Sequence, residues 1–283
     1  MTMARLDAIR GRRFGRFAAS GWRGWLCLAV LALALAGALW PPADPHAVDV
    51  RDALSGPSLA HPLGTDHVGR DVLARLAAGG MASLIAVAVA LAATLGLGAV
   101  AGLILAGGHP AARAAVQRLA EVALAVPSLV LALVLGALVG PGPVTIALAF
   151  AVTAWAPYAL VTAGLAETVM LRPYWLAARA LGVPMPTALW RHLVPGLRGA
   201  LGALAGADAG RAIILTASLG FLGLTADSGR PDWGAMIHEY RFFAFERPLL
   251  VVAPVAAIAT LALALHLLLD GGREVLPDAF FRR

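Results

Sequence analysis

Residues 81–106 read MASLIAVAVALAATLGLGAVAGLILA, a run of 26 residues without one charged or amide side chain. A helix that crosses the hydrocarbon of a bilayer needs about 20 mostly apolar residues. A helix that is apolar on every side is either buried in a large core or spans a membrane. This stretch therefore predicts a transmembrane helix.

Five further stretches, on both sides of this one, meet the same length and composition. They are residues 22–40, 119–139, 144–162, 201–224 and 249–269. We therefore expect an all-α membrane protein with six transmembrane helices. The stretch 201–224 is the least apolar of the six, because it contains Asp208 and Arg211.

The composition of the whole chain agrees with a membrane protein. Of its 283 residues, 60% are hydrophobic and 13% are charged, whereas about a quarter of the residues in globular chains are charged. The net charge is +6, and all 22 basic residues are Arg. Because no separate soluble basic domain is present, this charge favours a lipid surface over nucleic acid as a partner. Cys27 is the only cysteine, which excludes an internal disulfide and a thiolate metal cluster.

The arginines predict the orientation, because Arg-rich short loops stay in the cytoplasm. With six spans and the N-terminus inside, fifteen Arg residues fall on the cytoplasmic side and six on the outer side. We therefore expect both termini in the cytoplasm. Residues 22–40 follow several arginines, as the apolar part of a secretory signal does. Trp22, Trp25 and Trp40 bracket the run as interfacial aromatics do, so we expect a retained anchor.

This topology divides the chain into tails, an anchor and a core. Residues 1–21 form a cytoplasmic tail, 22–40 the first transmembrane helix, and 41–80 an extracytoplasmic segment. Residues 81–271 form the transmembrane core, and 272–283 a second cytoplasmic tail. Within the core, a cytoplasmic loop is expected at about 163–198 and an extracytoplasmic loop at about 225–248.

Three segments carry distinctive sequences. Residues 61–76 read HPLGTDHVGRDVLARL. Residues 174–182 read YWLAARALG and are followed by RHLVP at 191–195. Residues 218–224 read SLGFLGL and are followed by PDWGAMI at 231–237. In this order, the three segments resemble signatures of the permease subunits of binding-protein-dependent ABC importers, in the dipeptide/oligopeptide/nickel branch.

The resemblance implies the type I permease architecture and half of a translocation pathway in the bacterial inner membrane. The implied cargo is short peptides, with nickel or a metal chelate as the alternative. The implied partners are a second homologous permease, two cytoplasmic ATPase subunits and an extracytoplasmic solute-binding protein. No cofactor is expected in this subunit, since ATP and Mg would bind to the ATPases. The chain has no Lys and hence no phosphate-binding loop of the Gly-x-x-x-x-Gly-Lys-Ser/Thr type.

The sequence argues against two other classes of function. A membrane-embedded enzyme needs polar catalytic residues that converge at one depth, and only Asp208 and Arg211 come close, without a nucleophile or base beside them. A secondary transporter that works alone usually has a longer chain with internal inverted repeats. We therefore expect a transport subunit that is not itself an enzyme.

The segment 174–182 predicts a short helix that contacts a partner. Helical spacing places Ala177, Ala178 and Leu181 on neighbouring faces, with Gly182 positioned to end the helix. The resemblance implies that this coupling helix, including Arg179, docks into the ATPase; an ordinary amphipathic helix is the alternative. The glutamate that the family carries in this loop is replaced by Leu176.

The remaining polar candidates lie in the outer segment and in the fifth span. His61, Asp66, His67 and Asp71 have donor types that could bind a metal. We instead expect turns and a helix N-cap at these aspartates. Asp208 and Arg211 lie three residues apart, so that they can neutralise each other on one helical face. They are pathway candidates if they touch the solute and a structural pair if they do not; both interpretations stay open.

Overall fold

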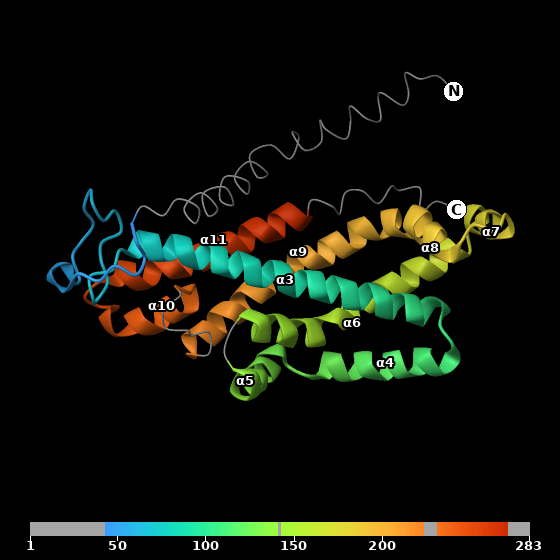
Figure 1. The fold of residues 1–283 in the computed structure, drawn as a ribbon, viewed down its shortest axis with the longest axis horizontal. Coiled ribbons are helices and arrows are strands. Elements are labelled where there is room, and N and C mark those ends of the chain that lie inside the picture. The colour runs from blue at the N-terminus through green and yellow to red at the C-terminus, as the bar shows by residue number, and fades with distance from the viewer. Residues whose placement is uncertain (1–42, 141–142, 224–230, 271–283) are drawn as a thin grey trace, which may run out of the picture.

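The computed structural model of the chain describes residues 43–140, 143–223 and 231–270. Within these ranges the chain forms an elongated bundle of helices without a named strand (Figure 1). The predicted first span, both predicted tails and Cys27 lie outside the described residues.

Four helices in the described part of the chain are long and apolar enough to cross a membrane. They are α3 (Val72–Gly107), α6 (Pro143–Met170), α9 (Val194–Phe221) and α11 (Pro248–Asp270). These helices coincide with the spans predicted at 81–106, 144–162, 201–224 and 249–269, except that α9 ends at Phe221 and residue 224 lies outside the described residues. Helix α3 begins nine residues before the predicted span and has 36 residues, which makes it about 54 Å long.

The span predicted at residues 119–139 contains Pro127, which predicts a kink, and the structure has a sharp break there. The segment divides into α4 (Pro110–Ala125) and α5 (Ser128–Val139), which bend by 92° at the break. Pro127 causes the break, because proline has no N–H to donate and pushes the residue before it out of the helical region. Val126 accordingly has extended backbone angles. Both α3 and α6 run toward the end of the bundle that holds α7. The two helices α4 and α5 together therefore lead the chain from the end of α3 back to the start of α6 (Figure 1).

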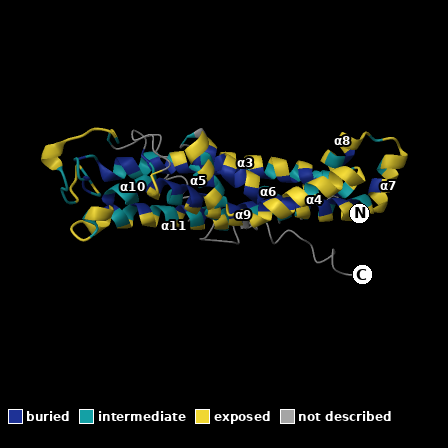
Figure 2. Ribbon diagram, turned by 90° about the horizontal axis from the view of Figure 1, so that it is seen from below, coloured by how far each residue is buried: buried dark blue, intermediate teal, exposed yellow. Residues whose placement is uncertain are grey.

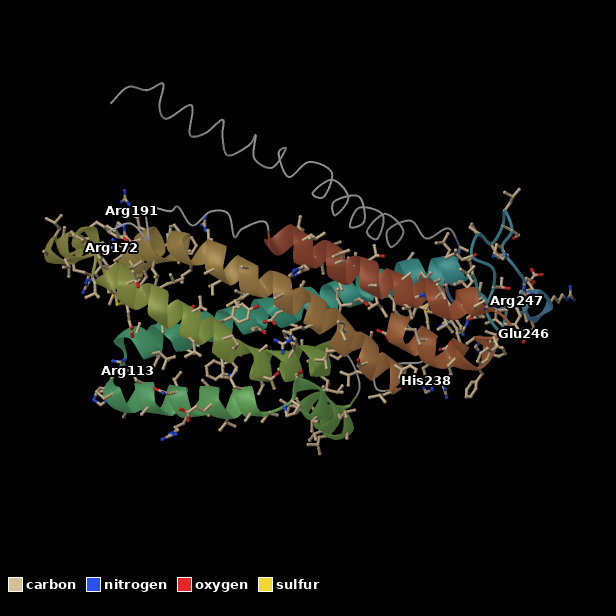
Figure 3. The ribbon with its side chains drawn as sticks, turned by 180° about the vertical axis from the view of Figure 1, so that it is seen from behind. Arg113, Arg172, Arg191, His238, Glu246 and Arg247 are labelled. Atoms are coloured by element: carbon tan, nitrogen blue, oxygen red, sulfur yellow. The ribbon has the colours of Figure 1, made fainter. Side chains whose placement is uncertain are left out.

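The two ends of the bundle carry different elements. One end, here called the α10 end, holds residues 43–71 with η1 (Val50–Asp52), α10 (Trp233–Tyr240) and η3 (Arg241–Phe243). The other, the α7 end, holds α7 (Pro173–Ala180), α8 (Met185–Ala188) and the π-helical η2 (Leu189–Leu193), which continues into α9. Figure 3 shows Arg113, Arg172 and Arg191 at the α7 end, with Glu246 and Arg247 at the opposite end.

The bundle core depends on close contact between α3 and α6. Gly98 and Gly102 lie one turn apart on the buried face of α3. A methyl group built on Gly98 would come within 2.3 Å of the Tyr158 Cβ, and one on Gly102 within 2.5 Å of the Thr162 Cβ. Such small-xxx-small spacing lets helix backbones approach closely in membrane proteins. Because lipid is as apolar as the side chains, the hydrophobic effect does not drive helices together there, and close van der Waals packing does so instead. Exposed residues follow the outside of the bundle, as Figure 2 shows.

Candidate functional site

Helix α7 is a short helix with a sharply defined end. Pro173 occupies its first turn, where a missing N–H costs nothing. At the other end Gly182 has a φ of 76°. The N–H groups of Gly182 and Val183 donate to the carbonyls of Arg179 and Ala178, both at 3.0 Å, which is the Schellman arrangement. The Arg179 guanidinium also donates to the Val183 carbonyl at 2.7 Å, and this contact braces the turn.

A buried tryptophan attaches α7 to the long helices. Trp175 is 4% exposed and packs in one apolar cluster with Ala166 and Val169 of α6, with Leu193 of η2 and with Leu197 of α9. The side chain therefore fixes α7 to both helices at once. A displacement of α7 is transmitted to α6 and α9 because close-packed interiors transmit strain.

The other side of this loop presents apolar residues outward. We call this the docking face; its members are Tyr174, Leu176, Leu181, Met185 and Trp190, all exposed. Leu181 is 84% exposed, and Leu176, at the position of the family glutamate, is 59% exposed. Of the predicted coupling residues, Ala177, Arg179 and Gly182 are also exposed, whereas Ala178 is half-buried. Several large apolar side chains exposed on one helical loop are typical of an interaction site.

At the α10 end, the segment 61–71 forms the turns and cap that its sequence predicts. Gly64 and Gly69 adopt positive φ angles of 78° and 83°. Asp71 is the N-cap of α3, where its carboxylate accepts from the Ala74 N–H at 2.6 Å and lies 2.8 Å from the His61 Nδ1. These contacts confirm the expected capping role of Asp71.

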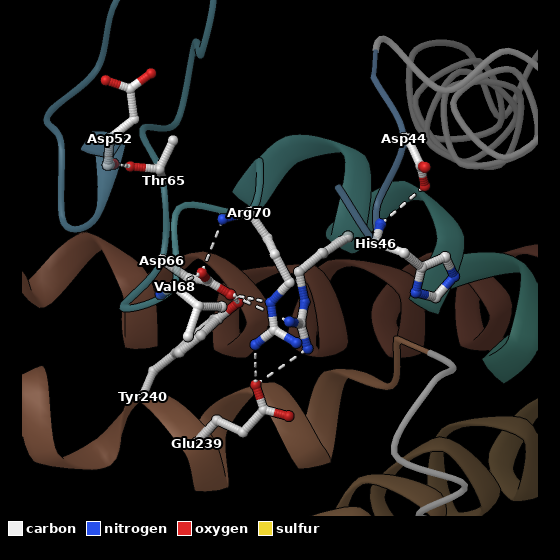
Figure 4. Close-up of polar contacts among 10 residues, drawn as sticks. Asp44, His46, Asp52, Thr65, Asp66, Val68, Arg70, Glu239 and Tyr240 are labelled. Atoms are coloured by element: carbon white, nitrogen blue, oxygen red, sulfur yellow. Dashed lines mark hydrogen bonds and ion pairs between the residues drawn. The ribbon is translucent and has the colours of Figure 1, made fainter. Parts of the chain in front are cut away.

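Asp66 lies at the centre of a charged network, drawn in Figure 4. Its side chain is fully buried. One carboxylate oxygen accepts from the N–H groups of Val68 and Arg70 at 3.0 and 2.9 Å. The other accepts from the guanidinium groups of Arg70 and Arg75 at 2.7 and 3.1 Å, and from the Tyr240 hydroxyl at 3.2 Å.

Glu239 of α10 completes this network. Its Oε2 accepts from Arg70 at 2.7 Å and from Arg75 at 3.1 Å. We call Asp66, Arg70, Arg75, Glu239 and Tyr240 the outer charge cluster. Two guanidiniums thus face two carboxylates. Burial raises the pKa of the Glu239 carboxyl group, and the charge of Arg70 opposes that rise. Burial, reinforced by the negative charge of Asp66, raises the pKa of Tyr240, so its hydroxyl stays protonated and donates.

The same region contains donors of the metal-binding type. Atoms of Asp66, His67 and Glu239 lie within 4.8 Å of one another. Both carboxylates, however, already bind the guanidiniums of Arg70 and Arg75. A divalent cation placed there would meet two positive charges at close range, which opposes binding. His67 stacks on Phe243 with ring centroids 5.4 Å apart. The arrangement is therefore suited to bracing the outer segment against α10.

The motif PDWGAMI lies against both α3 and α9. The Trp233 indole N–H donates to the Leu76 carbonyl at 2.8 Å, and its ring lies on Gly79 and Gly80, where a methyl group would approach within 2.9 and 3.0 Å. A Cβ built on Gly234 would lie 2.0 Å from the carbonyl oxygen of Ala217, so Gly234 packs directly on that backbone. The first and third sequence motifs are therefore two halves of one packed unit.

The structure brings Asp208 and Arg211 together on α9. The Arg211 guanidinium donates to the Asp208 carboxylate at 2.9 Å. The two side chains differ sharply in environment: Asp208 is 7% exposed and Arg211 is 64% exposed. Asp208 belongs to the core, whereas Arg211 projects from it.

Sequence reasoning did not identify Glu239, Tyr240, or the glycines of α3. Glu239 and Tyr240 follow the third motif without a pattern that marks them. The spacing of Gly98 and Gly102 could have been recognised as the small-xxx-small pattern of membrane helix pairs.

Comparison with known proteins gives consistent results over most of the chain. Residues 98–277 match the family described as binding-protein-dependent transport system inner membrane component. The nickel transport system permease protein NikC of Escherichia coli K12 is 33% identical over 91% of this chain and 95% of its own length. The probable D,D-dipeptide transport system permease protein DdpC of the same strain is 35% identical, over 82% and 78%. The glutathione transport system permease protein GsiD of Pectobacterium atrosepticum is 32% identical, over 94% and 88%.

Proposed function

The chain belongs to the family of inner-membrane components of binding-protein-dependent transport systems, and from that premise we propose that it forms half of a translocation pathway for short peptides. As a permease subunit of the peptide/nickel branch of ABC importers, it is a transport subunit. Two of the three relatives named above carry peptide-type solutes by their names. The nickel relative supports the second candidate, nickel or a metal chelate.

We propose the assembly that this role requires. A second, homologous permease covers the pathway side of the bundle, two ATPase subunits bind at the α7 end, and a solute-binding protein delivers cargo at the α10 end. The α7 end and both termini then lie in the cytoplasm. ATP and Mg²⁺ bind to the ATPase subunits, and no cofactor belongs to this chain.

The docking face carries this proposal. It is apolar, exposed and held by Trp175 against α6 and α9. An ATPase that closes around ATP would push α7 as a rigid unit, and Trp175 would pass the displacement to both long helices. The bundle then changes between inward and outward access by rigid-body movement.

Leu181→Arg tests the contact with the ATPase. Leu181 is 84% exposed and contributes only to the docking face, so the variant should fold with wild-type yield. A long charged side chain at the centre of an apolar interface should cost at least tenfold in ATPase retention during co-purification, and uptake should fall in proportion. Leu59→Arg is the matched control, since Leu59 is fully exposed at the α10 end. Wild-type ATPase retention in Leu181→Arg would reject the assignment.

Single cysteines test the orientation in intact cells. In a Cys27→Ala background, Ser58→Cys at the α10 end should react with an impermeant thiol reagent added outside. Thr187→Cys at the α7 end should react only after permeabilisation. Both positions are exposed, so accessibility reports the side of the membrane and not burial. Labelling of Thr187→Cys in intact cells would show that the orientation is inverted.

A further inference from the structure

One face of α9 is left uncovered by the other residues that the structure describes. Ala207, Arg211, Ile214, Ser218 and Phe221 follow one another at spacings of four and three residues, which places them on a single helical face. All are exposed except Ser218, which is half-buried. This stripe is continuous over four turns of the helix.

The stripe leads into an apolar groove toward the α10 end. The groove has a volume of about 390 Å³ and is lined by Ile214 and Phe221 of α9, Ile237 of α10 and Ile258 of α11. This volume lies within the range of small-molecule sites, which are mostly apolar with a few polar groups that fix orientation. Ser218 is a polar group in the lining.

Arg211 stands one helical turn from this groove. It lies about 25 Å from the first residue of α9 and about 15 Å from the last, at 1.5 Å per residue. Among the described residues, its guanidinium has one hydrogen-bond partner, Asp208, although a guanidinium carries five N–H donors. A charged group at membrane depth is costly in contact with lipid and usually faces water or a partner.

Asp208 binds Arg211 through one hydrogen bond, which leaves the other N–H groups of the guanidinium available. The carboxylate is buried and three residues earlier on the helix, so it fixes the guanidinium from the core side. The Arg211 side chain is 64% exposed among the described residues, which leaves its other N–H groups accessible. A guanidinium with free N–H groups binds carboxylates strongly and in a fixed geometry.

We infer that Arg211 and the adjoining groove form a solute-binding site that takes a carboxylate at the guanidinium and an apolar group in the groove. This inference rests on the proposed transport function and adds the chemical class of the cargo. A free peptide with an apolar C-terminal residue meets both requirements. A bare divalent cation does not, because Arg211 repels it.

The test measures the charge preference of the site directly. In assembled complexes in proteoliposomes, on a Cys27→Ala background, Ile214→Cys is labelled with anionic sulfonatoethyl and with cationic trimethylammonioethyl methanethiosulfonate. Ile214 is exposed, lines the groove and lies one turn from Arg211. Arg211→Gln should lower the anionic-to-cationic rate ratio about fivefold or more, and Arg211→Lys should keep most of it. Arg198→Gln is the matched control, because Arg198 is also an exposed arginine of α9 but lies about 20 Å from Arg211 along the helix.

Protection by solute completes the test. L-alanyl-L-leucine should slow labelling of Ile214→Cys, and its C-terminal amide should not. An unchanged rate ratio in Arg211→Gln, equal protection by the amide, or no labelling by either reagent would overturn the inference; the last result would mean that lipid or the second permease covers this face. Loss of ATPase retention in Leu181→Arg alongside any of these results would leave the transport role standing. Wild-type retention there would reject the docking face and leave the Arg211 site to the labelling experiment alone.

Discussion

Asp66→Asn is expected to lower the thermal unfolding midpoint of the purified protein by about 10 °C. Asp66 is fully buried and binds the guanidiniums of Arg70 and Arg75. Without its charge, Glu239 alone faces both cations. Removing one member of a buried ion pair costs about 3–5 kcal/mol, and each kcal/mol shifts the midpoint of a protein of 150–250 residues by about 2–4 °C. The measurement is a thermal melt in detergent.

Asp44→Asn provides the control for this substitution. Asp44 lies in the same outer segment and is exposed, and the one hydrogen bond of its carboxylate among the described residues is from the His46 N–H at 2.9 Å (Figure 4). Its loss should change stability by no more than about 0.5 kcal/mol. The double variant Asp66→Asn with Arg75→Gln should be more stable than the sum of the single effects predicts, because it removes one stranded charge. A midpoint of Asp66→Asn within two degrees of wild type would contradict the role of the outer charge cluster.

Gly102→Ala and Gly96→Ala should change stability in opposite directions. Both glycines lie within α3, where alanine is favoured over glycine by about 1 kcal/mol. Gly96 has open space around its Cα, so Gly96→Ala should be neutral or stabilising. At Gly102 a methyl group would lie 2.6 Å from the Ala159 carbonyl oxygen and 2.5 Å from the Thr162 Cβ. Overpacking of this kind costs about 1–3 kcal/mol or more, and a backbone atom cannot move away as a side chain can.

The larger variant Gly102→Leu should prevent α3 from packing on α6 altogether. We expect loss of monodisperse protein in size-exclusion chromatography, with normal yield of Gly96→Leu. If Gly102→Leu were recovered at wild-type yield and melting temperature, the close approach of α3 and α6 would be refuted.

The spans could be predicted from the sequence because hydropathy is a local property. Three of the predicted stretches lie within long helices and a fourth, 201–224, overlaps most of α9, because about 20 consecutive apolar residues are the length that spans a bilayer. In the stretch 119–139 the sequence predicts a bend at Pro127 but not its angle, because the angle depends on how the two halves pack against α3 and α6. The chain forms two helices there, with Pro127 at the start of α5.

The polar sites were less accessible to sequence reasoning. Asp71 could be recognised as a cap, because capping acts between neighbours in the chain. Glu239 could not, because its partner Arg70 is 169 residues away and nothing near either residue marks the contact. The pairing of Asp208 with Arg211 followed from their spacing, but the exposure of Arg211 depends on how α6 and α11 cover α9.

The distance along the chain between Arg70 and Glu239 has a consequence for synthesis. A ribosome must add 169 residues between them, which takes roughly ten to thirty seconds at about 5–20 residues per second. During that interval Asp66 is the only carboxylate of the outer charge cluster available to Arg70 and Arg75. Only the arrival of α10 supplies Glu239 as the second carboxylate and fills the indole-sized gap on Gly79 and Gly80 with Trp233. A chain that stops before residue 239 therefore exposes the unfinished state of its α10 end to membrane proteases, even when every earlier helix has been inserted correctly.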